Sequence, residues 1–279
     1  MAAPYSASTR RLVPTMQISN GIYSDTITLN SYDVDSFNST HTSYYFRIMQ
    51  EVAGAHAYQR NVAIAHLRQD NKTWVVTRTK MTIPQYIRWP NTFRIETWPQ
   101  QPWKLYFPRV CRAWNAENEI LFESLTHWVV MDTTTQRPVK PQTIAESFGP
   151  IATEGLVDPD LGKRVSFNEG EFVDLLVYEP TILYTDNDIN MHVNNVVFLQ
   201  WMLDSLPFAF RDNHVVGEVD ISYLAQTFRD DHIRVRTGLS EAGLLERDTP
   251  TLSHEVLRVL PTGETQAVCV ATTTWRRRD

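Results

Sequence analysis

Residues 186–206 read DNDINMHVNNVVFLQWMLDSL, where a dense polar loop changes abruptly into an apolar segment. Asp, Asn and His side chains crowd the first ten positions, whereas residues 196–206 are apolar on most sides. This pattern predicts a largely buried helix from about Asn195, with Asn194 or Asn195 as its cap. The simplest interpretation of the polar residues is a capping loop, and the rest of the chain decides whether that interpretation is sufficient.

A related pattern occurs earlier in the chain. Asp33-Val-Asp35 corresponds to Asp186-Asn-Asp188, an offset of 153 residues (186 − 33), and residues 41–60 have the i, i+3, i+4, i+7 apolar spacing of a helix. Strand-like segments follow both helices. In the first half these are residues 73–84, 92–99, 103–114 and 120–132, and in the second half residues 219–228, 232–239, 251–260 and 265–275. A duplication of one unit explains this order.

The two copies differ inside the polar loop. Phe37 stands where the second copy has Asn190, and Ser39 stands where it has His192. The first copy therefore has the sequence pattern of the same helix although its loop lacks the Asn and His side chains. Capping alone does not account for Asn190 and His192, which become candidates for a site.

One long helix followed by a series of strands predicts an α+β unit in which an antiparallel sheet wraps around that helix. Residues 133–168 are rich in Pro, Gly, Thr and Gln and lack sustained periodicity. We therefore expect an N-terminal tail at 1–20, a first domain at 21–140, a linker at 141–168 and a second domain at 169–279. The tail is expected to be disordered.

Composition narrows the function classes. The chain has 279 residues, 42% hydrophobic and 21% charged, which is typical of a globular protein with ample core. Its net charge of −6 argues against a nucleic-acid partner, and no apolar run reaches the roughly 18 residues of a membrane span. Cys111 and Cys269 make no disulfide framework, so a reducing compartment, the cytoplasm, is expected. The first residues are rich in Ser, Thr and Arg, as in transit peptides, so location in a plastid is an alternative if the source is eukaryotic.

The polar loop resembles the second-domain signature of acyl-acyl carrier protein thioesterases, which are double hot-dog proteins of plants and bacteria. The matching pattern is D-x-N-x-H-V-N-N before a Trp-containing helix, here Asp188, Asn190, His192, Val193, Asn194 and Asn195. Segments such as QEVAGAHA and TWVVTRTKMTI resemble first-domain segments in the same order. The resemblance spans roughly residues 22–275 and implies two tandem hot-dog domains.

The same resemblance implies an activity. It is hydrolysis of the thioester between a fatty acyl chain and acyl carrier protein, with release of free fatty acid and an end to chain elongation. It implies acyl-chain binding in the first domain and catalysis in the second. Asp188, Asn190 and His192 match positions with catalytic roles in the family. The implied partner is acyl carrier protein carrying its acyl chain.

A fourth catalytic position departs from the family pattern. Plant members read Y-R-R-E-C in the following strand, whereas this chain has Tyr223-Leu224-Ala225-Gln226-Thr227. Gln226 cannot accept a proton as Glu does, and Thr227 replaces a cysteine nucleophile. Asp188 then remains as the general base, either directly or by orienting His192, with Gln226 a weak catalytic candidate.

Hydrolysis also needs donors for the developing oxyanion. The free N–H groups at the start of the helix at Asn195 are suitable. Asn194 and Asn195 are expected to bind substrate there or to cap the helix, and Thr227 is a weaker substrate-binding candidate. No metal-binding or cofactor motif was found, so no metal and no cofactor are expected.

Several alternatives stay open. The chain could hydrolyse acyl-coenzyme A, or bind acyl chains or acyl carrier protein without turnover because of Gln226 and Thr227. An enoyl hydratase is disfavoured, because its motif D-x-N-P-x-H has a Pro and a different His spacing. The basic C-terminal segment WRRRD is either a solvated end or a contact for an acidic carrier protein. The sequence leaves acyl length and the choice between monomer and homodimer undecided.

Overall fold

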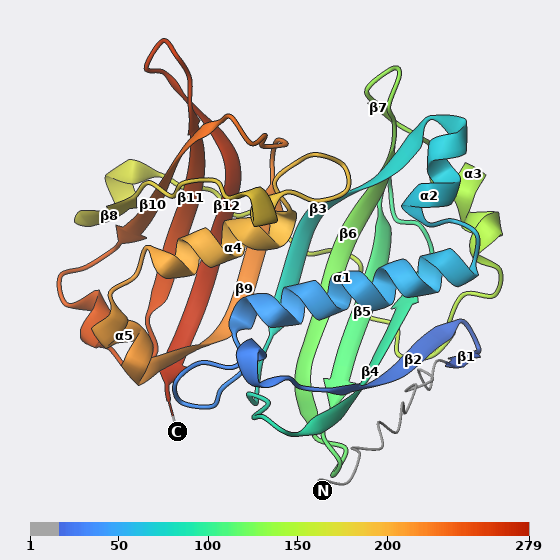
Figure 1. Cartoon of the computed structure of the whole chain (residues 1–279), viewed down its shortest axis with the longest axis horizontal. Helices are drawn as coiled ribbons and strands as arrows, with labels where there is room; N and C mark the ends of the chain where they lie inside the picture. The colour runs from blue at the N-terminus through green and yellow to red at the C-terminus, as the bar shows by residue number, and fades with distance from the viewer. Residues whose placement is uncertain (1–16, 279) are drawn as a thin grey trace, which may run out of the picture.

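Two long helices lie on the same face of one antiparallel sheet in the computed structural model, which describes residues 17–278 (Figure 1). They are α1 (Thr42–Gln59) and α4 (Asn195–Asp204). Figure 1 shows them starting near the centre of the molecule and running outward in opposite directions. Both helices predicted from the apolar spacing are confirmed, and the α+β class is confirmed with them.

The sheet has twelve strands, and its order is β1-β2-β4-β5-β6-β3-β9-β12-β11-β10-β8, with β7 paired to β6. The first half contributes β1 (Gln17–Ser19), β2 (Ile22–Thr28), β3 (Lys72–Thr82), β4 (Thr92–Pro99), β5 (Phe107–Trp114), β6 (Ile120–Asp132) and β7 (Arg137–Pro138). The second half contributes β8 (Asp174–Tyr178), β9 (His214–Tyr223), β10 (His232–Leu239), β11 (Thr251–Val259) and β12 (Thr265–Arg277). Short helices α2 (Ile64–Leu67), α3 (Gln142–Ala145) and α5 (Phe208–Asn213) lie between them.

The two halves join edge to edge through β3 and β9. These strands pair antiparallel with Lys80 opposite Asp220. Arg78, which is buried, donates to both carboxylate oxygens of Asp220 from Nε at 2.9 Å and Nη2 at 2.7 Å. It also donates to the backbone oxygens of Gly162 and Lys163, each at 2.9 Å. One guanidinium thus binds the facing strand and the connecting segment together.

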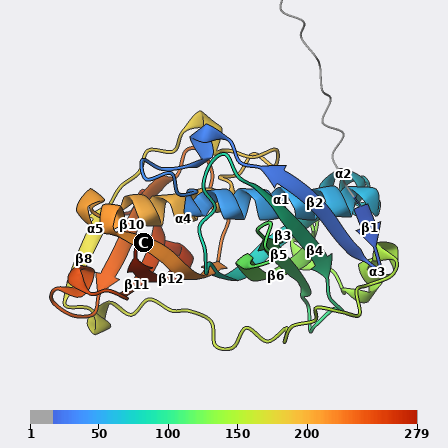
Figure 2. The ribbon, with the colours of Figure 1, turned by 90° about the horizontal axis from the view of Figure 1, so that it is seen from below.

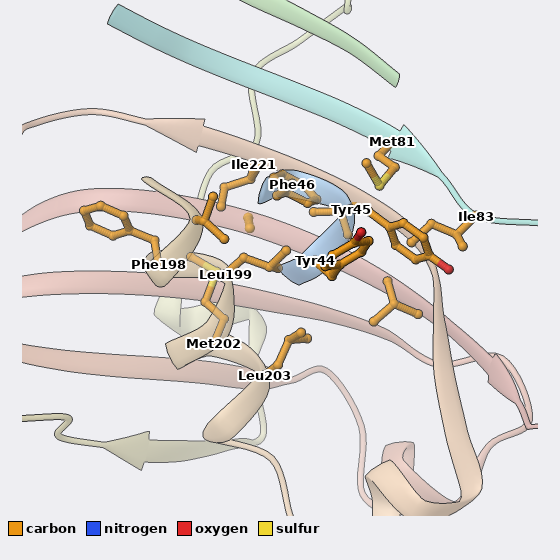
Figure 3. Packing of buried hydrophobic residues seen from close by; sticks show 14 of the residues in the cluster. Tyr44, Tyr45, Phe46, Met81, Ile83, Phe198, Leu199, Met202, Leu203 and Ile221 are labelled. Carbon is orange, nitrogen blue, oxygen red and sulfur yellow. The ribbon is translucent and has the colours of Figure 1, made fainter. Parts of the chain in front are cut away.

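One hydrophobic cluster runs through both halves. Aromatic residues Tyr44 to Phe46 at the start of α1 are buried, as are Leu199 and Met202 of α4. Figure 3 shows these side chains close together, with Met81 of β3 and Ile221 of β9 beside them. The apolar faces of the two helices therefore share a core at the junction, which fixes where α4 begins relative to α1.

The connection between the halves crosses the opposite face of the sheet. Figure 2 shows this segment running below the strands, on the side away from the helices. His127 makes a 2.8 Å hydrogen bond to the backbone oxygen of Pro159, and Gln100 accepts a 2.7 Å bond from the amide of Val157. The connecting segment therefore does not cover the face of the sheet on which α1 and α4 lie.

Two local expectations differ from the structure. Residues 1–16 of the expected disordered tail lie outside the described residues, and Gln17–Ser19 form a strand, β1, paired with β2. The strand expected at 219–228 runs instead from His214 to Tyr223. It ends there because the amides of Leu224 and Ala225 both donate to the oxygen of Val268, which interrupts the ladder. In the described chain no helix is long and apolar enough to cross a bilayer.

Candidate active site

The loop before α4 is organised by the Asp188 carboxylate. Its Oδ1 accepts from the backbone amide of Asn190 at 2.8 Å and from that of His192 at 3.5 Å. Its Oδ2 accepts from the Asn190 amide group, Nδ2, at 3.2 Å. Met191 between them takes a left-handed φ of 60°. Asp188 therefore shapes the loop through its backbone, and no hydrogen bond joins it to the His192 imidazole within residues 17–278.

The equivalent loop of the first half has the same construction. Asp35 Oδ1 accepts from the backbone amides of Phe37 and Ser39, each at 2.9 Å, and Asn38 takes a φ of 58°. Its second oxygen accepts from Arg278 at 2.9 Å instead of from a side chain of its own loop. The backbone role of the aspartate is thus common to both halves, whereas the Asn and His side chains occur only in the second.

Asn190 is held from two sides. Its Nδ2 donates to Asp188, and its Oδ1 accepts from Nη2 of Arg68 at 2.7 Å. Arg68, which follows α2 in the first half, also donates to the backbone oxygen of Ile189 at 3.2 Å. The first half therefore contributes a cation to a loop that belongs to the second.

His192 lies beside the segment that follows β9. Its ring meets the ring of Phe228 edge to face, with centroids 5.0 Å apart. The amide of Val193 donates to the backbone oxygen of Thr227 at 2.8 Å and fixes the two segments side by side. Among the described residues the imidazole makes no hydrogen bond, so its nitrogens remain available to a water molecule or a substrate.

The start of α4 leaves one donor free. Asn194 is the cap, and its side chain accepts from the amide of Val196 at 3.0 Å, as expected from the sequence. The backbone amide of Asn194 donates to the backbone oxygen of Asp186, and the backbone amide of Val197 donates to the backbone oxygen of Asn194. The amide of Asn195 has no hydrogen-bond partner within the part of the chain that the structure covers. It therefore stands as a free donor at the positive end of the helix.

Two cavities meet at this helix start. The first lies beneath α1 and has a volume of about 20 Å³. It is lined by Phe46, Met49, Gln50, Ala53, Val76, Thr79, Thr97, Arg109, Cys111, Thr126, Trp128 and Asn195. The second is a wider groove of about 290 Å³, lined by Asn30, Tyr32, Asp33, Tyr44, Arg47, Ile48, Gln50, Glu51, Asn194 and Val196. Gln50 lines both, so they adjoin. Asp188, Asn190 and His192 line neither cavity, although their loop leads directly into Asn194 and Asn195.

The family's fourth position lies apart from this network. Gln226 falls beyond the end of β9, with its side chain exposed and without a hydrogen bond in the described structure. Arg258 donates to its backbone oxygen. Thr227 is fully buried and its hydroxyl has no partner within residues 17–278. The structure brings Asp188, Asn190 and His192 together and leaves Gln226 outside their hydrogen bonds.

Other reactive groups are buried away from the loop. Burial raises the pKa of the Cys111 thiol and of the Cys269 thiol well above the usual value, so both are protonated at neutral pH. No group of three or more His, Cys, Asp or Glu side chains within residues 17–278 could hold a metal ion. In the basic C-terminal segment, Arg277 pairs with Asp248 and Arg278 with Asp35. These two arginines are engaged within the chain.

Three contributors were missed by sequence reasoning. Arg68 and Gln50 come from the first half, and their places at the loop and in the cavities depend on how the halves pack. Arg109 sits in an apolar strand pattern that predicts burial without showing which neighbours surround it. A charged residue inside a buried strand was the one local signal for Arg109.

Comparisons with known proteins agree with the repeated fold. The family model described as "Acyl-ACP thioesterase N-terminal domain" matches residues 20–147, and the model described as "Acyl-ACP thioesterase C-terminal domain" matches residues 176–277. Together they cover most of the chain.

The curated relatives are 24% and 26% identical to this chain in the two examples that follow. The palmitoyl-acyl carrier protein thioesterase of Gossypium hirsutum is 24% identical over 79% of this chain and 56% of its own length. The dodecanoyl-[acyl-carrier-protein] hydrolase of Cinnamomum camphora is 26% identical over 80% and 62%. Both are described as chloroplastic. The chain thus spans only about 56–62% of the length of these relatives.

Solved structures share the fold. The 12:0-ACP thioesterase from Umbellularia californica superposes with a TM-score of 0.80 at 22% identity, covering 94% of this chain and all of that one. An acyl-ACP thioesterase from Bacteroides thetaiotaomicron gives 0.74 at 21% identity, covering 92% and 98%. At these identities the likeness establishes the double hot-dog architecture.

Proposed function

The chain belongs to the acyl-ACP thioesterase family, and we propose that it hydrolyses the thioester of a fatty acyl-acyl carrier protein, releasing free fatty acid and ending chain elongation. The observation that carries this proposal is the position of Asn195. This residue opens α4 directly after the polar loop, and it also lines the cavity beneath α1. A thioester at this point has the polar loop on one side and a place for its acyl chain on the other.

We assign the general base to His192. Its imidazole is partly exposed and free of hydrogen bonds within residues 17–278. It takes a proton from a water molecule whose oxygen attacks the thioester carbonyl carbon. When the carbon–sulfur bond breaks, the same proton passes to the leaving thiolate, so the products are the acid and the thiol. A general base of this kind contributes about 10²–10⁴ in rate.

The oxyanion is assigned to the start of α4. The free amide of Asn195 is one donor, and the side chain of the same residue lines the cavity. The positive end of the helix dipole adds to the stabilisation of the negative oxygen. One such donor is worth about 2.7–4 kcal/mol in the transition state.

Asp188 and Asn190 act as positioning residues in this scheme. Asp188 holds the backbone of the loop in the manner of Asp35, and Asn190 is fixed between Asp188 and Arg68. Their hydrogen bonds present His192 to the water. Gln226, exposed and outside this network, is a spectator in the scheme, and Thr227 contributes packing.

The adjoining groove suits the carrier protein's prosthetic arm. It is open to the surface, holds about 290 Å³ and ends at Asn194. The acyl chain passes Gln50 into the narrower cavity, which it widens by moving flexible side chains such as Met49. The place of action is the cytoplasm of a bacterium or the plastid of a plant, and a homodimer is compatible with the scheme.

Free-acid release tests the proposal. The purified chain is incubated with palmitoyl- and dodecanoyl-acyl carrier protein, the same acyl-coenzyme A thioesters, and an enoyl thioester. Release from carrier-protein substrates with a higher kcat/KM than from coenzyme A substrates supports it. Binding of acyl carrier protein without release would show a non-catalytic member, and faster release from coenzyme A would identify an acyl-coenzyme A thioesterase.

A further inference from the structure

The cavity beneath α1 is lined by more polar groups than a hydrocarbon chain requires. Three threonines, a glutamine, an asparagine and an arginine line it, in addition to its apolar residues. The glutamine oxygen, Oε1 of Gln50, is buried without a hydrogen-bond partner in the part of the chain that the structure describes, and so is the indole nitrogen of Trp128. A cavity that only bound alkyl carbons would leave these groups unsatisfied, at a cost in binding free energy.

Arg109 is the most unusual of these groups. It projects from the middle of β5 and is 8% exposed. Among the described residues only its Nη1 makes hydrogen bonds, to Nδ1 of His56 at 3.3 Å and to Oγ1 of Thr97 at 3.2 Å. No carboxylate of the described chain pairs with it.

The surroundings leave this cation uncompensated. Burial lowers the pKa of Arg109 to about 10, so the guanidinium keeps its charge at neutral pH. Burial lowers the pKa of His56 to about 3, with Arg109 acting in the same direction, so the imidazole is neutral. Buried charges in proteins are ordinarily paired. Nε and Nη2 of Arg109 are donors without a protein acceptor in residues 17–278.

We propose that the acyl group taken by this cavity carries an acceptor oxygen, a carboxylate or a carbonyl, which binds Arg109. The inference rests on the proposed function, because it places the acyl chain beneath α1. Water in the cavity can solvate the guanidinium while the site is free. A plain alkyl chain would displace that water and leave the charge without acceptors, whereas an oxygen on the chain replaces the water and forms a charge-assisted hydrogen bond.

Matched substrates test the proposal. Carrier-protein thioesters of short, medium and long acyl chains are each prepared in plain, terminally carboxylated and mid-chain oxo forms. We expect an oxygenated form to exceed the plain chain of equal length in kcat/KM by at least about tenfold, the effect of one hydrogen bond to a charged group. The carboxylated and oxo arms identify which oxygen is taken. Equal rates, or a preference for the plain chain at every length, overturn the proposal.

Variants assign the preference to the arginine. Arg109→Met keeps a flexible stem without charge and is expected to abolish the preference for oxygenated chains, whereas Arg109→Lys is expected to retain part of it. If Arg109→Met does not fold, Gln50→Leu at the partly exposed helix face tests the same cavity, and it is expected to shift the preference toward plain chains. An unchanged preference in the folded variants contradicts the role of this cavity.

Binding of free acids separates this inference from the proposed function. Calorimetry with dicarboxylic, oxo and plain fatty acids needs no turnover. If no thioester is hydrolysed, the proposed function fails, yet tighter binding of an oxygenated acid that is lost in Arg109→Met still supports the cavity assignment. If the thioester is hydrolysed but plain acids bind more tightly than oxygenated acids, the proposed function stands and the cavity assignment fails.

Discussion

Asp188 and Asp35 accept the same pair of backbone hydrogen bonds in equivalent loops, although only one of the loops carries Asn and His side chains. The first loop is therefore an internal control for the second. Features present in both loops serve the fold, and features present only in the second are candidates for chemistry. At the scale of single residues, this comparison assigns Asp188 a role in the fold of the loop and leaves His192 as the candidate for chemistry.

His192→Ala should lower kcat by at least about 10², the low end of the contribution of a general base. The side chain is partly exposed and makes no hydrogen bond in the described chain, so the thermal unfolding midpoint should change little. Ser39→Ala at the equivalent position of the first loop is the matched control and should leave kcat unchanged. Equal losses in both variants would mean that the loops act only through stability.

Asp188→Asn should cost less than His192→Ala. An amide oxygen can still accept the two backbone bonds, but the new amide group opposes Nδ2 of Asn190 and weakens its orientation. We expect kcat to fall by about tenfold, the equivalent of one hydrogen bond to a charged group. Steady-state kinetics of the two variants side by side decide this point. A loss of 10³ or more in Asp188→Asn would identify Asp188 itself as the base.

At the scale of elements, β10, β11 and β12 bury a histidine between two threonines. His254 is fully buried, with its ring nitrogens 2.8 Å from Oγ1 of Thr237 and 2.7 Å from Oγ1 of Thr273. Burial lowers its pKa to about 3, whereas an unfolded histidine titrates near 6.5. The neutral ring is thus buried in the second half of the sheet.

This histidine predicts an acid-side loss of stability. Between about pH 6.5 and pH 3 the unfolded chain binds a proton that the folded chain excludes, so the free energy of unfolding falls as pH falls. The slope reaches up to about 1.4 kcal/mol per pH unit for one such group. Urea unfolding from pH 7 to pH 4.5 should show a shallower slope in His254→Gln than in the wild type. An identical slope would assign the acid sensitivity to other groups.

The junction of β3 and β9 depends on the ion pair of Arg78 with Asp220, whose side chains are 8% and 15% exposed. Arg78→Met leaves a nearly buried carboxylate without its partner and should lower the free energy of unfolding by about 3–5 kcal/mol. The double variant with Asp220→Leu removes the stranded charge and should recover part of that loss. Urea titrations of both provide the test, and a double variant as unstable as the single one would contradict this account.

Most elements could be predicted because their patterns are local. The strands β4, β6 and β10 occupy the expected residue ranges, and Asn194 caps α4. The segment after Tyr223 could not, because it is apolar and polar in alternation like a strand, whereas the amides of Leu224 and Ala225 both donate to the oxygen of Val268 and end the regular ladder. The side-chain cluster of the loop was visible in the sequence. The hydrogen bonds that give its members different roles depend on distances that the sequence does not encode locally.

At the scale of the whole molecule, two equivalent loops with different side chains lie at one continuous sheet. The second copy supplies Asn190 and His192, and the first supplies the cavity and Arg68. The helix start at Asn195 meets the cavity beneath α1 because β3 pairs with β9 and the two helices share a core. Neither half contains all parts of the candidate site, so the candidate site forms only when the two halves pair.

Arg68 tests this dependence directly, since it joins the halves at the loop. Its two bonds to Asn190 and Ile189 lie at the surface, so Arg68→Ala should leave the unfolding free energy within about 0.5 kcal/mol of the wild type. With Asn190 held from one side only, kcat should fall by about three- to tenfold, within the range of about 0.5–1.5 kcal/mol for the net contribution of one hydrogen bond. Arg247→Ala, at an exposed arginine that pairs with Glu241 and lines neither cavity, is the matched control for charge removal. If both variants lose activity equally, the loss reflects surface charge, such as attraction of an acidic carrier protein, and the contact with Asn190 has no catalytic role.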